Sequence, residues 1–537
     1  MRISGALACP YKPMRPVVRY PMESRETQMM TGMSRRNFMG VMGAMGAASV
    51  AAAAGVANAE ESKSASKQAE QVVLSDGTVW NGTPAEIAAL GGSTMPREEL
   101  NRRRKEYVDS QTDFVAEDGT VIPAVYVKMR ALLHTYGLGC GEGDLDPSMF
   151  TRVMKLFTEE QVAGYLEMPW DDWFTAAEFY YKSQKEGTGR SYEECKELCE
   201  VFSKAGWLPF RTHNEGIVYN IPSFTAEGVN TYTLCDEYYA DPFNFDWPFM
   251  TSGIPEDHAL MGTPAYLSIP ISEDVVAEGS DLLAYDDIDL LIEDHEYIAV
   301  QPCSCRYGVY VNECHEKGED FPTFVDFCTG DYSDFRDGNG DRIETCLAMG
   351  DDAEYLVSLG LGRRITKEEA HAMIQQSRED GFMIHCLYGK EHAWVCQCNP
   401  KVCGITAQWA AGAEALGGWD VLEEKSIGFN HRSHYTLEVD FDKCIKCGAC
   451  MARCPMEAIA MEGEGGTPQV TDHLCMRCGQ CAYVCPQEAR KLALRPMDEI
   501  PELPHQLEDD NNLKGAYRFE HGLIGRGTTP ALDVYTA

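Results

Sequence analysis

The sequence predicts an α+β protein with three folded parts: a helical module, a cysteine-rich central α+β domain and a small module with a repeated cysteine pattern. Three observations predict this arrangement. Helix-capping signals precede amphipathic runs from about residue 150 onward. The chain holds 22 cysteines, and about half of them lie in spacings that suit metal binding. Eight of them form two runs related by an offset of 31 residues, which indicates an internal duplication.

The length of 537 residues is sufficient for two to four domains. We expect six segments: an export signal at 1–59, a segment of unknown fold at 60–148, the helical module at 149–264, the central domain at 265–432, the repeated cysteine module at 433–497 and a C-terminal tail at 498–537.

The charge of the chain restricts its partners. It has 46 Lys and Arg residues against 84 Asp and Glu residues, which gives a formal net charge of -38. Such a chain repels nucleic acid and anionic lipid surfaces. We therefore expect no nucleic-acid partner, and a protein partner with a basic docking surface.

The N-terminal segment has the pattern of an export signal. Arg35 and Arg36 precede a Gly-, Ala- and Met-rich stretch at 40–56, and the small residues at 57–59 suit a cleavage site. This resembles a twin-arginine signal, which implies export of a folded protein with its cofactor already inserted. A Sec signal or an N-terminal anchor helix is the alternative. No later segment approaches the roughly 20 apolar residues of a membrane span, so we expect an extracytoplasmic protein without a stable span after cleavage.

The helical module follows. Capping boxes at Thr158 and Ser191 predict two helices, and Gly206 suits the end of the second. Apolar runs at 207–210 and 217–219 then predict a hairpin. This order of elements resembles a winged-helix module, for which we expect a structural or docking role.

The second of these helices does not suit nucleic acid or metal. It carries Glu193, Glu194, Glu197 and Glu200, which have the wrong charge for a surface facing phosphate. Cys195 and Cys199, four residues apart, could bind a metal. They share their helical stripe with Leu198 and Phe202, however, which favours burial as small apolar side chains.

One helix of the central domain is predicted directly. Thr366 and Glu369 form a capping signal, and Gly381 suits the end of the helix. Ala370, Met373 and Ile374 recur at helical spacing and should face the core.

The repeated cysteine module carries the most specific pattern. Each run reads Cys-x2-Cys-x2-Cys-x3-Cys-Pro, and Gly448 and Gly479 recur at the same offset. The first run is Cys444, Cys447, Cys450 and Cys454, and the second is Cys475, Cys478, Cys481 and Cys485. This pattern resembles bacterial-type two-cluster ferredoxins and implies two [4Fe–4S] clusters. Zinc or disulfides are the alternatives, but zinc sites do not require the duplicated x3-Cys-Pro ending.

A cubane needs four thiolates, and a short loop with three cysteines cannot easily reach the fourth corner. In the bacterial spacing the fourth cysteine of each run binds the other cluster. We therefore expect cluster I on Cys444, Cys447, Cys450 and Cys485. We expect cluster II on Cys475, Cys478, Cys481 and Cys454.

A second constellation of cysteines lies in the central domain. Cys-x-Cys pairs bring two sulfurs together where a turn, rather than a regular strand, holds them, so two such pairs in one domain suggest a set of ligands. The candidate ligands of a third metal site are Cys303, Cys305, Cys346, Cys396, Cys398 and Cys403. His385 could add a ligand, although a histidine beside apolar residues is more often part of a core.

The whole arrangement is similar to a loosely defined family of dicluster ferredoxin proteins. The resemblance rests on Cys305-Arg306 within Cys-x-Cys-Arg, on Cys346-Leu347, on the segment 362–369 and on the ferredoxin module. The late cysteine group at 396–403 has fewer adjacent cysteines than that family implies. The spacing of these cysteines favours a third metal site. The alternatives are disulfides formed after export and buried thiols without a metal.

These features imply a function of electron transfer. No haem-attachment motif, dinucleotide-binding glycine motif or Gly-x-Ser-x-Gly motif is present in the sequence. The leading hypothesis is an electron-transfer component of an oxidoreductase system rather than a stand-alone enzyme, with no catalytic residue assigned. An oxidoreductase with its own active site at a third metal centre is the alternative, and a scaffold stabilised by its clusters is the third hypothesis.

Overall fold

The computed structural model describes most of the chain between residues 95 and 524. The described residues are 95–115, 119–136, 153–154, 156–170, 173–205, 207–213, 216–220, 262–264, 266–320, 335–337, 339–390, 394–463, 466–504, 507–522 and 524. The predicted export signal and Gly206 lie outside this part of the chain. None of the helices in the described ranges is long and apolar enough to cross a membrane.

The helical module is larger than its predicted boundaries. Its helices are α4 (Arg97–Asp109), α5 (Ala124–His134), α7 (Glu159–Leu166), α8 (Ala176–Glu186) and α9 (Tyr192–Lys204), and its strands are β1 (Phe114–Val115), β2 (Val121–Ile122), β3 (Phe210–His213) and β4 (Gly216–Tyr219). One hydrophobic core contains residues of α5, α7, α8 and α9, from Val108 to Tyr219. The segment for which the sequence predicts no fold therefore contributes two helices to this module.

Capping side chains set the start of the helices in this module. Thr158, Thr175 and Ser191 each accept a hydrogen bond from the backbone N–H three residues later and complete a capping box. The boxes at Thr158 and Ser191 are those that the sequence predicts. Cys195 and Cys199 of α9 are fully buried in the core, as the sequence predicts for small apolar side chains on this stripe.

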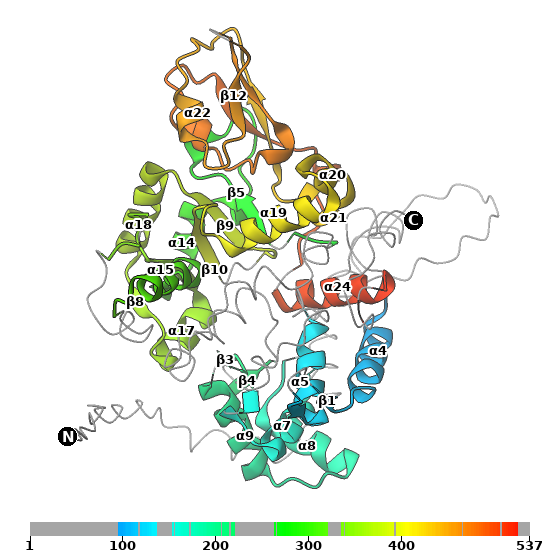
Figure 1. Cartoon of the computed structure of the whole chain (residues 1–537). Helices are drawn as coiled ribbons and strands as arrows, with labels where there is room; N and C mark the ends of the chain where they lie inside the picture. The colour runs from blue at the N-terminus through cyan, green and yellow to red at the C-terminus, as the bar shows by residue number, and fades with distance from the viewer. Residues whose placement is uncertain are drawn as a thin grey trace, which may run out of the picture. The chain divides into compact units, whose positions relative to one another are not determined.

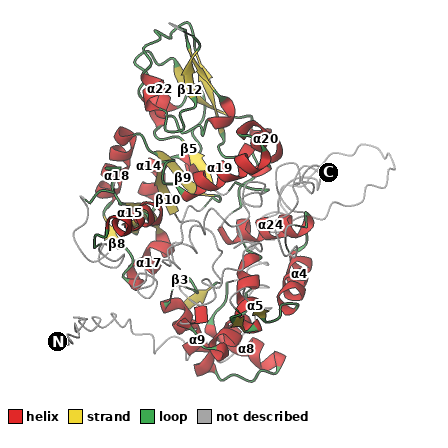
Figure 2. Cartoon of the chain, viewed as in Figure 1, coloured by secondary structure: helices red, strands yellow, loops and turns green. Residues whose placement is uncertain are grey.

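The central domain is built on a six-stranded sheet in the order β5-β9-β10-β7-β6-β8. Figures 1 and 2 show β5, β9 and β10 of this sheet close to α14 and α19. Its strands are β5 (Tyr266–Ile269), β6 (Ile298–Pro302), β7 (Glu344–Met349), β8 (Arg363–Ile365), β9 (Met383–Leu387) and β10 (Trp394–Cys398). All neighbouring strands pair antiparallel. Helices and strands thus mix in this domain, as the α+β prediction requires.

Helices cover both faces of this sheet. One face packs on α14 (Ile288–Asp294) and α18 (Lys367–Asp380) in a core that includes Leu347, Ile384, Cys386 and Val395. The other face packs on α15 (Ser304–Lys317), α17 (Gly350–Leu359) and α19 (Gly404–Leu416). Because side chains alternate along a strand, each strand contributes one set of residues to each core.

Helix α18 has the ends that the sequence predicts. Thr366 accepts a hydrogen bond from the N–H of Glu369, and Gly381 ends the helix in the left-handed conformation. Ala370, Met373 and Ile374 are buried.

The C-terminal module begins at β11 (Tyr435–Val439), which pairs with β14 (Arg490–Leu494). Between them lie α22 (Ala449–Arg453), β12 (Ile459–Met461), β13 (Pro468–Val470) and α23 (Gln480–Tyr483). After this module the chain forms α24 (Leu507–Glu520), within the segment that the sequence predicts only as a tail. Arg518 of α24 donates to the carbonyl oxygen of His134, so this helix packs against α5 of the helical module.

Candidate functional site

The C-terminal module contains two cavities that are each lined by four cysteines. The first is lined by Cys444, Cys447, Cys450 and Cys485. The second is lined by Cys454, Cys475, Cys478 and Cys481. The structure therefore brings together the two sets of cysteines predicted for clusters I and II, including the exchange of the fourth cysteine between the runs.

The loops around the two cavities repeat the same backbone geometry. Lys446 and Arg477, which are 31 residues apart, have φ values of 58° and 55°. Gly448 and Gly479 follow with φ values of 76° and 87°. Left-handed residues curl a short loop tightly, so three cysteines within seven residues can face one cavity. The non-glycine residues in this conformation are a strained feature that occurs twice at equivalent positions.

Backbone N–H groups point at the fourth cysteine of each run. The amides of Ala458 and Ala489 donate to the sulfur atoms of Cys454 and Cys485, each at 3.3 Å. Such amide hydrogen bonds stabilise the negative charge on a ligating thiolate.

Burial works against free thiolates in the second cavity. It raises the pKa of Cys481 to about 12 and that of Cys478 well above its ordinary value. Without a metal these thiols would therefore stay protonated at neutral pH. Four soft sulfur donors around an otherwise apolar cavity fit a [4Fe–4S] cluster, whose irons replace the protons.

The two cavities differ in their surroundings. Cys447, on the first cavity, is exposed, and Ile445 beside it is 59% exposed. Cys478, on the second, is buried, and its carbonyl oxygen accepts a hydrogen bond from the N–H of Ile271 in the central domain at 3.1 Å. The second cavity thus lies against the central domain, and the first lies at the protein surface.

The candidate ligands of the central domain meet on one face of its sheet. His385 of β9 pairs with Cys396 of β10, and Cys346 of β7 pairs with Gln301 of β6. Cys346 and Cys396 contact each other through their thiols, which places these four residues in one row across four neighbouring strands. This row faces the core that α15, α17 and α19 cover.

The remaining cysteines join the same group. The thiol of Cys396 also contacts that of Cys398, and Cys398 contacts Cys403, directly before α19. Cys303 contacts Cys305, whose sulfur accepts a hydrogen bond from the N–H of Gly404 at 3.4 Å. Four of the predicted cysteines therefore follow one another in a chain of contacts from Cys346 to Cys403, and the Cys303–Cys305 pair adjoins that chain through the amide of Gly404.

The expectation that a turn holds each Cys-x-Cys pair is wrong for Cys396 and Cys398. Cys396 and Cys398 lie on the regular strand β10, not on a turn. Because side chains two apart on a strand share a face, the strand itself directs both sulfurs to the same side. The Cys303–Cys305 pair does lie at a change of direction, between β6 and the start of α15.

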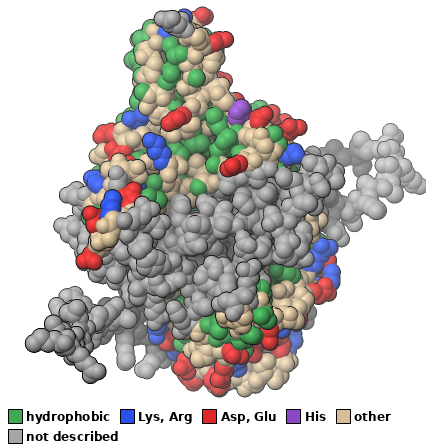
Figure 3. All heavy atoms as spheres, in the orientation of Figure 1, with side chains coloured by type: hydrophobic (Ala, Val, Ile, Leu, Met, Phe, Trp, Pro, Cys, Tyr) green, Lys and Arg blue, Asp and Glu red, His purple; other side chains and the backbone are tan. Residues whose placement is uncertain are grey.

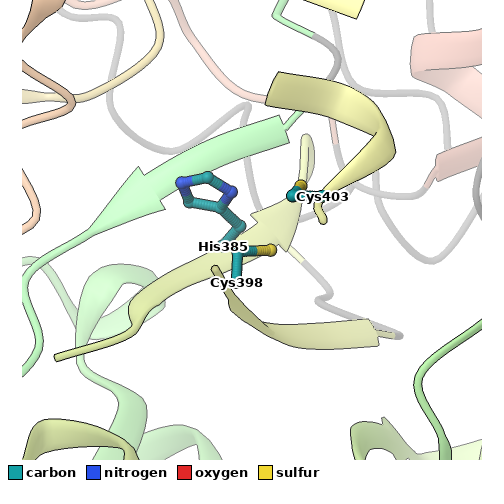
Figure 4. Close-up of side chains that lie close together, drawn as sticks. All are labelled: His385, Cys398 and Cys403. Carbon is teal, nitrogen blue, oxygen red and sulfur yellow. The ribbon is translucent and has the colours of Figure 1, made fainter. Parts of the chain in front are cut away.

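His385 belongs to this cysteine group. The ligand atoms of His385, Cys398 and Cys403 all lie within 4.8 Å of one another (Figure 4). The imidazole is fully buried, and Tyr266 and Trp409 flank it with ring centroids at 6.4 and 6.5 Å. The sequence left its role open because His385 stands beside apolar Ile384. In the structure Ile384 faces the opposite core, so it does not share the surroundings of His385.

Arg306 ends the Cys-x-Cys-Arg motif at 303–306, but the sequence analysis assigned no role to it. Its fully buried guanidinium donates to the carbonyl oxygens of Arg342 and Gln397 and to the hydroxyl of Thr345. It thereby ties the start of α15 to β7 and β10, the elements that carry the other thiols. The charge of Arg306 also helps to lower the pKa of Cys303, after the larger effect of the contact with Cys305.

Comparison with known proteins identifies one part of the chain. Residues 436–486 match the family model of the 4Fe-4S dicluster domain. No curated protein and no solved structure matches the chain. The matched residues contain nearly the whole of the two four-cysteine cavities. Residues 436–486 are therefore an iron–sulfur domain of the ferredoxin type, set in a protein of mixed helices and sheet.

Proposed function

We propose that this protein is an exported electron-transfer protein that carries two [4Fe–4S] clusters and passes single electrons to or from a separate oxidoreductase. The observation that carries this proposal is the pair of matched cavities, each lined by four cysteines. A [4Fe–4S] cluster, when bound, takes up and releases one electron without proton transfer to a substrate. The chain offers two such sites in one small module.

The residues of the module have defined tasks in this function. The thiolates of the first cavity hold cluster I, and those of the second hold cluster II. The amides of Ala458 and Ala489 stabilise negative charge at Cys454 and Cys485. Apolar neighbours such as Met476, which is 1% exposed, exclude water from the second cavity.

The surface near the first cavity suits a redox partner. Phe441 and Ile445 are 49% and 59% exposed, close to the exposed Cys447. Figure 3 shows hydrophobic side chains gathered on the part of the surface formed by this module. We assign electron exchange with the partner to this edge. The net charge of -38 favours a partner whose docking surface is basic.

The helical module has a structural role in this proposal. The order α8, α9, β3, β4 supports the likeness to a winged helix, but Glu193, Glu194 and Glu197 on α9 are exposed and acidic. Arg211 at the hairpin pairs with Asp352 of α17 at 3.6 Å, and the hydroxyl of Tyr355 donates to the carbonyl oxygen of Ser203. These contacts join the module to the central domain.

A second function is favoured by the thiol and imidazole group of the central domain. An oxidoreductase could use a metal centre there as its own active site, with electrons supplied by the ferredoxin module. The two functions differ in what the isolated protein does with electrons: a carrier only stores and releases them, and an enzyme turns over a small substrate.

Iron analysis and reduction test the proposal. Anaerobically purified protein should contain at least about eight iron atoms and eight sulfide ions per chain, as two cubanes require. An artificial donor should reduce these clusters, and an acceptor protein should reoxidise them reversibly. A colourless protein loaded with zinc would contradict the proposal. Clusters that cannot be reduced reversibly would favour the scaffold function.

A further inference from the structure

We propose that the central domain holds a third iron–sulfur centre, bound by ligands drawn from its six cysteines and from His385. The cysteines are Cys303, Cys305, Cys346, Cys396, Cys398 and Cys403. This inference goes beyond the proposed function and does not depend on it, because none of these residues belongs to the ferredoxin module. It rests on four features of the group: its donor atoms, its branched contacts, an unpartnered imidazole and the positive charge around it.

The donor atoms select the kind of metal. The connected group contains six thiols and one imidazole, and no carboxylate takes part in the contacts that join them. Thiolate and imidazole ligands favour zinc, copper(I) and iron–sulfur clusters over hard cations. A structural zinc ion uses four ligands in a tetrahedron. His385, Cys398 and Cys403 lie within 4.8 Å of one another, and the further thiols beside them supply more sulfur donors than one zinc ion needs, which suits a polynuclear iron–sulfur centre.

The contacts among the thiols are branched rather than paired. Cys396 contacts both Cys346 and Cys398, and Cys398 contacts both Cys396 and Cys403. A disulfide joins two sulfurs and excludes a third. The contacts therefore do not divide these thiols into disulfide pairs, and the ligand atoms of Cys398, Cys403 and His385 lie within 4.8 Å of one another, close enough to share one centre.

His385 supplies an independent observation. Its side chain is fully buried, and neither ring nitrogen has a hydrogen-bond partner among the described residues. A buried imidazole without a partner costs free energy, because it has lost its hydrogen bonds to water. Its ligand atom lies within 4.8 Å of the sulfurs of Cys398 and Cys403. A metal bound between these three side chains would satisfy one of the two ring nitrogens.

Positive charge surrounds the group and would stabilise its thiolates. Two long helices, α15 and α19, begin directly after Cys303 and Cys403, so both N-termini face the sulfurs. The first amide of α19, that of Gly404, donates to the sulfur of Cys305 at 3.4 Å. Helix N-termini and a neighbouring guanidinium favour the thiolate form. Arg306, fully buried beside this group, supplies the guanidinium.

One hydrophobic core connects the proposed centre with the second ferredoxin cavity. Met476 and Cys478, which line that cavity, belong to the same hydrophobic core as Cys346, Cys403 and Trp409. A third centre would therefore extend the row of clusters from the surface, through cluster II, into the central domain.

The test uses the full-length protein, purified anaerobically, with iron and sulfide counted per chain. The wild type should hold more than eight iron atoms, close to twelve if the third centre is a cubane. The double variant Cys398→Ser/Cys403→Ser should lose about four of them and keep the electron paramagnetic resonance signals of clusters I and II. Cys386→Ala is the matched control, because Cys386 is equally buried on β9 but faces the opposite core. It should retain the full iron content.

A second variant covers the case in which the double variant does not fold. His385→Gln preserves size and polarity, and it should change the Mössbauer spectrum of the third centre or remove that centre, with circular dichroism unchanged. Three results would overturn the proposal: about eight iron atoms in both wild type and double variant, zinc bound in place of iron, or disulfides among these cysteines in the exported protein. A wild type without any iron would contradict the proposed function as well.

Discussion

Cys454 and Cys485 occupy equivalent positions in the two runs, yet each lines the cavity of the other run. Replacing Cys454 with Ala should therefore abolish or convert the cluster built on Cys475, Cys478 and Cys481 and leave the other cluster intact. The expected loss is one to four iron atoms per chain, since a cubane lacking one ligand loses that iron or disassembles. Electron paramagnetic resonance of the reduced protein would identify the missing cluster.

Cys485→Ala is the reciprocal control for this prediction. It should damage the cluster on Cys444, Cys447 and Cys450 and spare the other. Damage to the cluster of the same run in either variant would show that the ligands are not exchanged.

His431 should make the stability of the protein depend on pH. Burial lowers its pKa to about 4, with smaller contributions from the charges of Arg495 and His434. Between pH 6.5 and 4 the unfolded chain binds a proton at this site and the native protein does not, so stability falls as the pH falls. The free energy of unfolding should drop by about 2 kcal/mol from pH 7 to pH 5 through this residue alone.

Anaerobic urea unfolding at the two pH values measures this effect. His431→Gln removes the titration, so the difference between pH 7 and pH 5 should shrink by that amount relative to the wild type. An unchanged difference would mean that His431 is protonated in the native protein.

At the scale of the elements, the two cluster loops differ in what covers them. Gly448 and Gly479 are equivalent and both left-handed. A Cβ atom at Gly448 would meet nothing within 4 Å, whereas one at Gly479 would lie 2.6 Å from Cγ2 of Val275 in the central domain. Val275 is 1% exposed, and its branched side chain cannot easily move away.

Gly479→Ala should therefore destabilise the protein more than Gly448→Ala. Both variants bear the cost of a left-handed alanine, about 1 kcal/mol. Only Gly479→Ala adds overpacking against Val275, about 1–3 kcal/mol. Unfolding midpoints of the two variants measure the difference. Equal midpoints would show that the second loop does not pack against the central domain as described.

At the scale of the whole molecule, export should follow the twin-arginine route. Replacing Arg35 and Arg36 together with Lys keeps the charge but removes the pattern that the export receptor reads. Precursor with its clusters inserted should then accumulate in the cytoplasm. Immunoblots of cell fractions, with iron analysis of the cytoplasmic form, measure the effect. Normal export of this variant would point to the Sec route and would make disulfides in the central domain more credible.

The contacts that join the parts of the chain are distant in sequence. Arg104 of α4 donates to Asn512 of α24, and Arg378 of α18 donates to the carbonyl oxygen of Ile271. No local pattern could reveal such pairs, because each arginine has the pattern of an ordinary charged position on a helix. For the same reason the sequence analysis treated the segment around α24 as a tail.

The sequence by itself determined whatever depends on near neighbours. The two cysteine runs, the caps at Thr158, Ser191 and Thr366, and the end of α18 at Gly381 involve atoms only a few residues apart, so spacing alone specifies them. Residue type alone also singled out the six thiols of the central domain as candidate ligands, and their metal binding stays a prediction.

Only the tertiary structure decided how these local features combine. The sheet order β5-β9-β10-β7-β6-β8 places His385 opposite Cys396 and brings Cys346 beside it, although these residues are distant along the chain or on separate strands. Strand pairing across such distances depends on which faces the helices cover, a property of the whole core rather than of any segment. The same packing set the second cavity against the central domain and left the first at the surface, a difference that two cysteine runs of identical spacing could not have revealed.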